Sequence, residues 1–371
     1  MTSHTAYLDW NATAPLRPEA AAAIGEALAQ TGNPSSVHSH GRAARAIVER
    51  ARAQVAAFQG AAPAEIVFTS GGSEANSLAL RGAGARAVLV SAIEHDSVRQ
   101  AVPKAGILEV SPDGIVDLDA LDRRLAVTPG PALVSLMLAN NETGVIQPVA
   151  DAAAIAHRHG ALLHCDAVQG AGKLALDGTS LGADLLTISA HKLGGPAGIG
   201  ALVVAPHVLM AALQAGGGQE RGRRAGTENL SGIAGFGAAC AAAAGGGDAW
   251  PRVAALRGEA ERRLLAIAPE APVYGAAAAR LPNTLCIGMP GVAAATQVMA
   301  LDLAGVMVSA GAACSSGKVR RSHVLDAMGV AAADAECAIR ISLGWSTTAA
   351  EIDLLVDAWG ALYARTRASA A

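Results

Sequence analysis

Short hydrophobic runs recur between residues 66 and 204, and helix-like stretches such as 149–159 separate most of them. Near-continuous apolar runs are typical of strands that are covered on both faces of a sheet. The expected strands are 66–69, 87–90, 133–137, 161–163, 185–188 and 201–204. This alternation predicts an α/β fold with a doubly wound domain, in which ligands bind at the strand ends.

The pattern changes near residue 255. One helix ends in the Ala- and Gly-rich run 241–247, and a second long helical stretch covers 252–267. After it, shorter strands at 284–287 and 339–342 alternate with fewer helices. A chain of 371 residues is long enough for a large domain and a smaller one. We therefore expect a large domain over 15–255 and a small α+β domain that includes 256–371.

Two of the expected strands lead into polar residues that suggest a chemistry. The run 161–163 is followed by Asp166, and 185–188 leads into a turn that carries Lys192 between small residues. Enzymes that use pyridoxal 5'-phosphate (PLP) need a lysine amine for the aldehyde and a carboxylate for the pyridine nitrogen. Each residue also has an ordinary alternative, since Asp166 could cap a helix and Lys192 could be a solvated loop lysine.

Further motifs surround this pair in a fixed order along the chain. They are 7–9 (YLD), 32–38 (GNPSSVH), 68–76 (FTSGGSEAN), 94–98 (EHDSV), 140–144 (NNETG), 216–221 (GGGQER), 224–229 (RAGTEN), 311–316 (GAACSS) and 351–353 (EID). With these motifs the chain resembles the cysteine desulfurases, PLP enzymes of the class V aminotransferase fold, in their nitrogen-fixation and iron–sulfur-assembly branch. The resemblance implies PLP transferase fold type I with a mixed seven-stranded sheet. It also implies that residues 1–14 pack with the small domain, which would carry the catalytic cysteine loop.

The expected phosphate site lies where a strand meets a helix. Residues 70–75 follow the strand 66–69 and include Gly72 and Ser73 at the start of a helical stretch. Glycines let backbone N–H groups approach an anion, and a helix N-terminus carries a partial positive charge. We expect the cofactor phosphate there, with the backbone and hydroxyl of Ser73 as donors. The alternative is an ordinary capped helix start.

Three more phosphate ligands are implied by the resemblance. Ser189 and His191 flank the position of Lys192. Thr227, in a Gly-rich loop, matches the residue that reaches the phosphate from the partner subunit, so the resemblance implies a homodimer. A flexible connector is the alternative for the loop of Thr227.

The resemblance also assigns the residues around the cofactor ring. It implies that His95 stacks on the ring and moves protons, that Asp166 pairs with the pyridine nitrogen, and that Gln169 donates to O3′. Asn141 would lie near O3′ and the substrate carboxylate. The alternatives are a surface histidine at 95 and a plain turn residue at 141.

Arg340 lies within an otherwise apolar strand. A buried guanidinium without a partner is very costly. A bidentate contact with the α-carboxylate of a substrate would supply that partner. A structural ion pair is the alternative.

Cys314 lies in the run of small residues 309–318. Buried cysteines usually lie within apolar strands or helices, whereas a cysteine on a small-residue loop is accessible. A nucleophile that carries sulfur needs such access, and we assign this role to Cys314. The other four cysteines, which look structural, are Cys165, Cys240, Cys286 and Cys337.

The resemblance implies conversion of L-cysteine to L-alanine, with the sulfur held on Cys314 as a persulfide. An acceptor protein, such as an iron–sulfur scaffold, would receive it. A selenocysteine lyase or another class V PLP enzyme is the alternative, although the cysteine at 314 argues against an aminotransferase. A non-catalytic sulfur-transfer partner is disfavoured by the presence of Lys192, Asp166, His95 and Cys314.

Composition bears on the expected partners, on membrane association and on metal binding. The net charge is −3 with no basic block, so we expect no nucleic-acid partner. The longest uncharged apolar stretch, 232–247, is short of the roughly 20 residues of a membrane helix. The first residues do not suggest a signal peptide. Five cysteines without metal-ligand spacing predict free thiols in a reducing cytoplasm and no metal site.

Overall fold

The structure, a computed structural model, describes residues 5–174, 178–245, 249–313 and 319–370. Its largest sheet has seven strands in the order β2-β8-β7-β6-β5-β3-β4. Strand β8 is antiparallel to both neighbours and the other pairs are parallel, so the sheet is mixed, as expected. The strands are β2 (Ile66–Thr69), β3 (Ala87–Ser91), β4 (Gly106–Leu108), β5 (Ala132–Met137), β6 (Leu162–Asp166), β7 (Leu185–Ser189) and β8 (Gly200–Val204).

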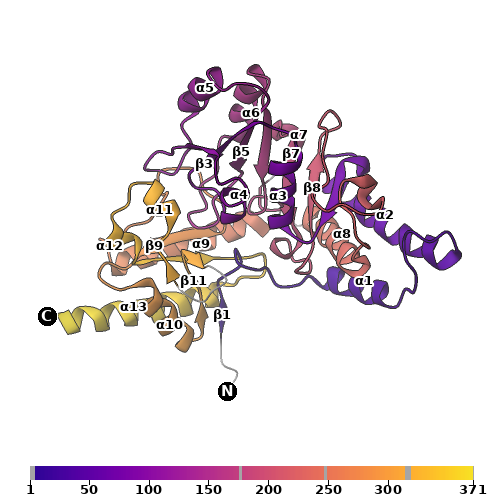
Figure 1. The fold of residues 1–371 in the computed structure, drawn as a ribbon. Coiled ribbons are helices and arrows are strands. Elements are labelled where there is room, and N and C mark those ends of the chain that lie inside the picture. Colours follow the sequence, from indigo (N-terminus) through magenta and orange to yellow (C-terminus); the bar gives the residue numbers. More distant parts are fainter. Residues whose placement is uncertain (1–4, 175–177, 246–248, 314–318, 371) are drawn as a thin grey trace.

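Side chains alternate between the two faces of this sheet, as the period of two in a strand requires. Ile66 and Phe68 join one core with α2, α5, α6 and α8, whereas Val67 joins another core with α3 and α4. Both faces are thus covered, which explains the continuous apolar runs. The helices of this domain are α1 (Pro18–Leu28), α2 (Ser39–Gln59), α3 (Gly72–Gly82), α4 (Asp96–Arg99), α5 (Leu118–Ala126), α6 (Val149–Arg158), α7 (Gly178–Leu181) and α8 (Leu230–Ala244). Figure 1 shows α1, α2 and α8 on the side of the sheet that faces away from the C-terminal part.

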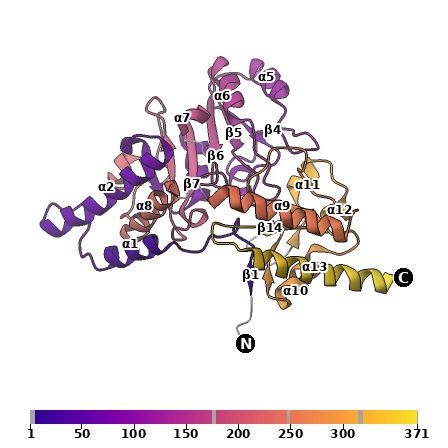
Figure 2. The ribbon, with the colours of Figure 1, turned by 180° about the vertical axis from the view of Figure 1, so that it is seen from behind.

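The C-terminal part has its own core around a three-stranded antiparallel sheet in the order β11-β14-β9. Its elements are α9 (Ala249–Ile267), β9 (Thr284–Gly288), α10 (Ala294–Leu303), β10 (Val306–Met307), β11 (Ser309–Ala310), β12 (Ala312–Ala313), β13 (Val319–Arg320), α11 (His323–Ala327), α12 (Ala332–Ala335), β14 (Ala338–Ser342) and α13 (Ala349–Ala370). The expected domain limit at 255 falls within α9, whose Val253 and Leu264 lie in this second core. Figure 2 shows α9 and α13 along this part of the molecule.

The N-terminal segment connects the two parts. Strand β1 (Ala6–Tyr7) pairs with β10 in the small part, and Leu8 lies in the same core. Further along, the backbone N–H of Ala14 donates to His191 O at 2.9 Å, beside the turn of the predicted lysine. The ring of Trp10 lies so close to Gly344 that a Cβ at that position would overlap it. Residues 9–14 are therefore held at the junction of the two cores.

No single helix in the described residues is both long and apolar enough to span a membrane. The pair α8 and α9 meets the length and composition criteria only when taken together, across a bend of 80°. Helix α8 is largely buried against α1 and α2, which accounts for its apolar composition.

Candidate active site

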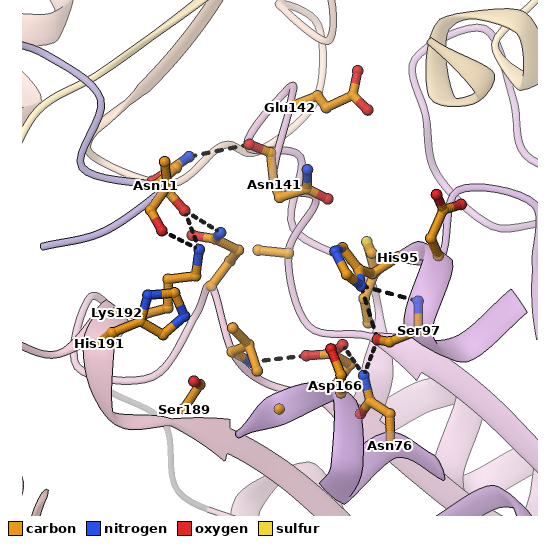
Figure 3. A pocket seen from close by; sticks show the side chains of 18 of the residues that line it. Asn11, Asn76, His95, Ser97, Asn141, Glu142, Asp166, Ser189, His191 and Lys192 are labelled. Atoms are coloured by element: carbon orange, nitrogen blue, oxygen red, sulfur yellow. Dashed lines mark hydrogen bonds between the residues drawn. The ribbon is translucent and has the colours of Figure 1, made fainter. Parts of the chain in front are cut away.

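A cavity of about 380 Å³ lies at the carboxyl ends of β5, β6 and β7, where the small part and the N-terminal segment close it. Most of the predicted site residues line it together, as Figure 3 shows in part: Gly72, Ser73, His95, Asn141, Asp166, Gln169, Ser189, His191, Lys192 and Arg340. Thr227 instead lines a separate cavity of about 140 Å³, beside Phe68 and Ile199. Cys314 lies outside the described residues, in the segment that β12 and β13 border.

Lys192 ends a short 3-10 turn that follows β7. Its Nζ donates to the carbonyl oxygens of Asn11 at 2.5 Å and Ala12 at 2.7 Å. Burial, helped by the positive charge of Arg340, lowers the pKa of Lys192 to about 8. An amine with this pKa is neutral, and hence nucleophilic, in an appreciable fraction of molecules near neutral pH.

Asp166 is buried at the end of β6 with both oxygens hydrogen-bonded. Oδ1 accepts from the backbone N–H of Val168 at 3.0 Å, and Oδ2 accepts from Asn76 Nδ2 at 2.7 Å. The amide of Asn76 also donates to Ser97 Oγ at 2.9 Å. These donors fix the orientation of the carboxylate, which lines the cavity.

His95 caps the short helix α4. Its Nδ1 accepts from the backbone N–H of Ser97 at 3.1 Å and lies 2.8 Å from Ser97 Oγ. Because Nδ1 accepts a backbone hydrogen bond, the proton of the neutral ring is on Nε2. Figure 3 shows the resulting chain of contacts from His95 through Ser97 and Asn76 to Asp166.

The other end of the cavity has the features of an anion site. Helix α3 begins at Gly72, where a Cβ would lie 3.0 Å from Val168 Cγ2. Ser73 and Ser189 bring hydroxyls to the same region. His191 Nδ1 lies 3.1 Å from Thr13 Oγ1, and burial together with Lys192 lowers the pKa of His191 to about 4. A neutral imidazole, hydroxyls and a helix N-terminus can together bind a phosphate.

Arg340 has a structural ion pair and also lines the cavity. Its Nη2 lies 2.7 Å from Asp9 Oδ1, and its Nη1 donates to Asn141 O at 3.1 Å. Its Nε is buried and has no hydrogen-bond partner within the described residues. The sequence presented the ion pair and the substrate contact as alternatives. The ion pair is present, and the contact with a substrate carboxylate stays a prediction.

Gln169 is already engaged within the protein. Its Nε2 donates to Asn11 O at 2.9 Å, and its Oε1 accepts from Lys173 Nζ at 3.0 Å. The predicted contact with a cofactor oxygen would therefore compete with the bond to Asn11 or be shared with it.

Several side chains that line or adjoin the cavity were not assigned from the sequence, among them Asn11, Asn76, Glu94 and Lys173. Asn76 follows Ser73 by three residues in a motif already singled out, so helical spacing alone places both on one face. Glu94 is fully buried, and burial with the nearby charge of Asp166 raises the pKa of Glu94 well above its usual value. Burial thus favours the protonated form of Glu94, whose Oε1 accepts from the backbone N–H of Met137 at 2.7 Å.

The four described cysteines, Cys165, Cys240, Cys286 and Cys337, are buried free thiols. Cys165, which adjoins Asp166, points into the core of the sheet and is not among the residues of the cavity. Burial raises the pKa of Cys165 well above that of an ordinary thiol, which disfavours the nucleophilic thiolate. Within the described residues, no group of three or more His, Cys, Asp or Glu side chains has the arrangement of a metal site.

The cavity has the parts that PLP requires: a deprotonatable lysine, a buried carboxylate opposite it and an anion site at a helix N-terminus. Fold and site together are those of the fold type I transferases. The chain belongs to the aminotransferase class-V family, whose model matches residues 6–355.

Comparison with known proteins agrees with this assignment and confirms the family expected from the sequence. The chain is 46% identical over 368 residues to a cysteine desulfurase of Cereibacter sphaeroides, covering 95% of this chain and 94% of that one. It is 40% identical over 372 residues to a cysteine desulfurase of Klebsiella pneumoniae, covering 98% and 94%. The X-ray structure of a NifS-like protein from Rickettsia africae superposes with a TM-score of 0.90 at 35% identity, covering 97% and 99%.

Proposed function

We propose that this chain is a PLP-dependent cysteine desulfurase, which converts L-cysteine to L-alanine and retains the sulfur on Cys314 as a persulfide. The observation that carries the proposal is one cavity in which the Lys192 amine, the Asp166 carboxylate and the anion site around Gly72 surround a common space. When bound, PLP supplies an electron sink for charge that develops at the substrate Cα.

Each side chain then has a definite task. Asp166, fixed by Val168 and Asn76, would hold a proton on the ring nitrogen of the bound cofactor. Lys192 Nζ, with its lowered pKa, can take the proton from the substrate Cα. His95 presents Nε2–H toward the site because its Nδ1 is bound to Ser97. The guanidinium of Arg340 supplies the charge that a substrate carboxylate needs.

Cys314 performs the sulfur transfer in this proposal. Its thiolate attacks the substrate sulfur, so an S–S bond forms and the substrate C–S bond breaks. The electron pair of the C–S bond takes up a proton and becomes a C–H bond of alanine. Sulfur is oxidised to the persulfide level and the carbon is reduced, so no further oxidant or reductant is needed. The described cysteines are buried, which leaves this role to Cys314.

The proposal extends to assembly, partner and location. We propose a homodimer in which Thr227 reaches the phosphate of the neighbouring subunit, since Thr227 lies outside the main cavity of its own chain. The persulfide would pass to an acceptor protein such as an iron–sulfur scaffold in the cytoplasm. Dilution should then release PLP together with dimer dissociation, by mass action. A PLP-saturated monomer in sedimentation would exclude this arrangement.

The decisive experiment uses Cys314→Ala, with Cys337→Ala as the matched control in the same part of the chain. We expect Cys314→Ala to keep PLP but to lose alanine formation from L-cysteine by at least about a hundredfold, the scale for removal of a nucleophile. The control should stay within about twofold of the unmodified protein, because Cys337 is buried away from the cavity.

Two outcomes of this experiment would change the assignment. Near-normal alanine formation by Cys314→Ala would show that Cys314 is not the nucleophile. Absence of desulfuration in the unmodified protein, with turnover of selenocysteine, would assign the chain to the selenocysteine lyases.

A further inference from the structure

Lys173 is a buried lysine beside the cavity that the proposed reaction does not use. Its Nζ donates to Asn11 Oδ1 and to Gln169 Oε1, both at 3.0 Å. Neither acceptor is a carboxylate, and no ion pair of Lys173 is found within the described residues. A neutral amine has two N–H donors, and these two acceptors satisfy both of them.

The choice of lysine at this position is informative because the chain uses lysine sparingly. Only four of its 28 basic residues are lysines, namely Lys104, Lys173, Lys192 and Lys318. An arginine could not replace Lys173 as a neutral donor, since a guanidinium does not lose its proton in proteins. Burial and the positive charges of Lys192 and Arg340 lower the pKa of Lys173 well below its usual value. Burial thus favours the neutral form of Lys173, which is the form that its two hydrogen-bond acceptors satisfy.

Asn11, one partner of Lys173, links the walls of the cavity. Its side chain also accepts from Asn283 Nδ2 at 3.0 Å and donates to Thr284 Oγ1 at 2.9 Å, both from the small part. Its carbonyl oxygen accepts from Gln169 Nε2 and from Lys192 Nζ. Lys173 thus binds the side chain of Asn11 directly. It also binds Gln169, whose side chain donates to the carbonyl oxygen of Asn11.

We infer that Lys173 is a positioning residue: as a neutral amine it fixes Asn11 and Gln169, so that the carbonyls of Asn11 and Ala12 hold the amine of Lys192 whenever that amine is not bonded to the cofactor. The catalytic use of this arrangement rests on the proposed function. A released amine that is held there stays beside the reacting atoms, and its acceptors set how readily it takes up a proton.

The test measures the pKa of Lys192 in the full-length chain stripped of cofactor. Acetic anhydride acetylates neutral amines, so the pH dependence of Lys192 acetylation, read by peptide mass spectrometry, reports its pKa. Lys104 is exposed and serves as the internal reference. In Lys173→Met, the acceptors of Lys192 lose their support, and the pKa of Lys192 should fall by about one unit, the scale of one weakened hydrogen bond to a charged group.

The sign of the shift separates the alternatives. If Lys173 were a cation, its removal would relieve repulsion and raise the pKa of Lys192. If Lys173 only filled space, the pKa would not change. Either result would overturn the inference. The acetylation requires no turnover, so it remains informative even if the protein proves not to desulfurate cysteine, which the assay of Cys314→Ala tests separately.

A double-mutant cycle tests whether Lys173 acts through Asn11. Asn11→Ala should lower the pKa of Lys192 as Lys173→Met does, and the double variant should show less than the sum of the two shifts. Additive shifts would mean that Lys173 does not act through Asn11. Lys104→Met, on the surface, should leave the pKa of Lys192 unchanged. Should Lys173→Met unfold in thermal melts, Lys173→Gln, an uncharged side chain of shorter reach, takes its place with the same expected fall in the pKa of Lys192.

Discussion

The two walls of the cavity are built in different ways. On one wall, Asp166 is the last residue of β6, and Lys192 follows the end of the neighbouring parallel strand β7. On the other wall, Arg340 of β14 is held by Asp9, 331 positions away in the chain, and by Asn141, 199 positions away. The first wall follows from strand order in one sheet, whereas the second exists only when three distant segments have docked.

This difference has an energetic consequence. Asp166 receives a donor two residues along its own chain, from Val168, so part of its orientation is local. The pair of Arg340 and Asp9 is largely buried, and a buried ion pair is costly if either partner is lost. The wall of Asp166 and Lys192, called the sheet wall below, should therefore tolerate changes in the rest of the molecule better than the wall of Arg340 does.

The largest expected effect is on the sheet wall. Lys192→Ala removes the amine that binds the cofactor, and we expect alanine formation from L-cysteine to fall by at least about a thousandfold. Borohydride should fix the cofactor to Lys192 in the unmodified protein, as peptide mapping can show with four lysines to compare. Lys104→Ala, at an exposed position, is the control and should be fully active. An adduct mapped to Lys104 or Lys173 would contradict the assignment.

A smaller effect is expected on the opposite wall. Arg340→Lys keeps a positive charge but loses the planar fork that can serve Asp9 and a substrate carboxylate together. The KM for L-cysteine should rise by about ten- to a hundredfold with a smaller change in kcat, because the lost contact binds substrate. Asp9→Asn, which leaves Arg340 in place, should raise KM less. A KM within about twofold of normal in Arg340→Lys would restrict Arg340 to its structural ion pair.

The two walls also differ in how far the sequence predicts them. The six strands predicted from apolar runs in the large domain are all present, because strands covered on both faces must be apolar throughout. Strand β4 was not predicted, since it lies at the sheet edge and only Leu108 of its three residues is buried. Asp166 and Lys192 were found because strand ends concentrate site residues.

The opposite wall could not be assembled in the same way. Asn11 and Lys173 carry no local signal of their task, since both lie in turns. Their contact depends on how the N-terminal segment crosses between the two cores, a tertiary event that periodicity does not encode. Arg340 was noticed only because a charge within an apolar strand demands a partner. The partner that it has, Asp9, was not predicted.

The smallest expected effect concerns the interior beneath the sheet wall. His164 is fully buried on β6, with Nδ1 at 2.8 Å from Ser135 Oγ and Nε2 at 3.0 Å from Thr187 Oγ1. Burial lowers the pKa of His164 to about 4. Since the unfolded chain binds this proton more readily than the folded chain does, stability is complete above the usual histidine pKa of about 6.5 and declines as the pH falls toward 4.

The decline from His164 alone should reach about 3 kcal/mol in the free energy of unfolding near its folded-state pKa. Urea unfolding between about pH 7 and pH 4.5 measures it, and His164→Gln should lose this share of the pH dependence, because a glutamine has no proton to gain. His191, whose pKa is also lowered to about 4, adds a contribution of the same sign and stays in this variant. The control His40→Gln, at an exposed position, should keep the full pH dependence. An unaltered pH dependence in His164→Gln would mean that the interior beneath Asp166 admits water, and the sheet wall would then be no better shielded than the wall of Arg340.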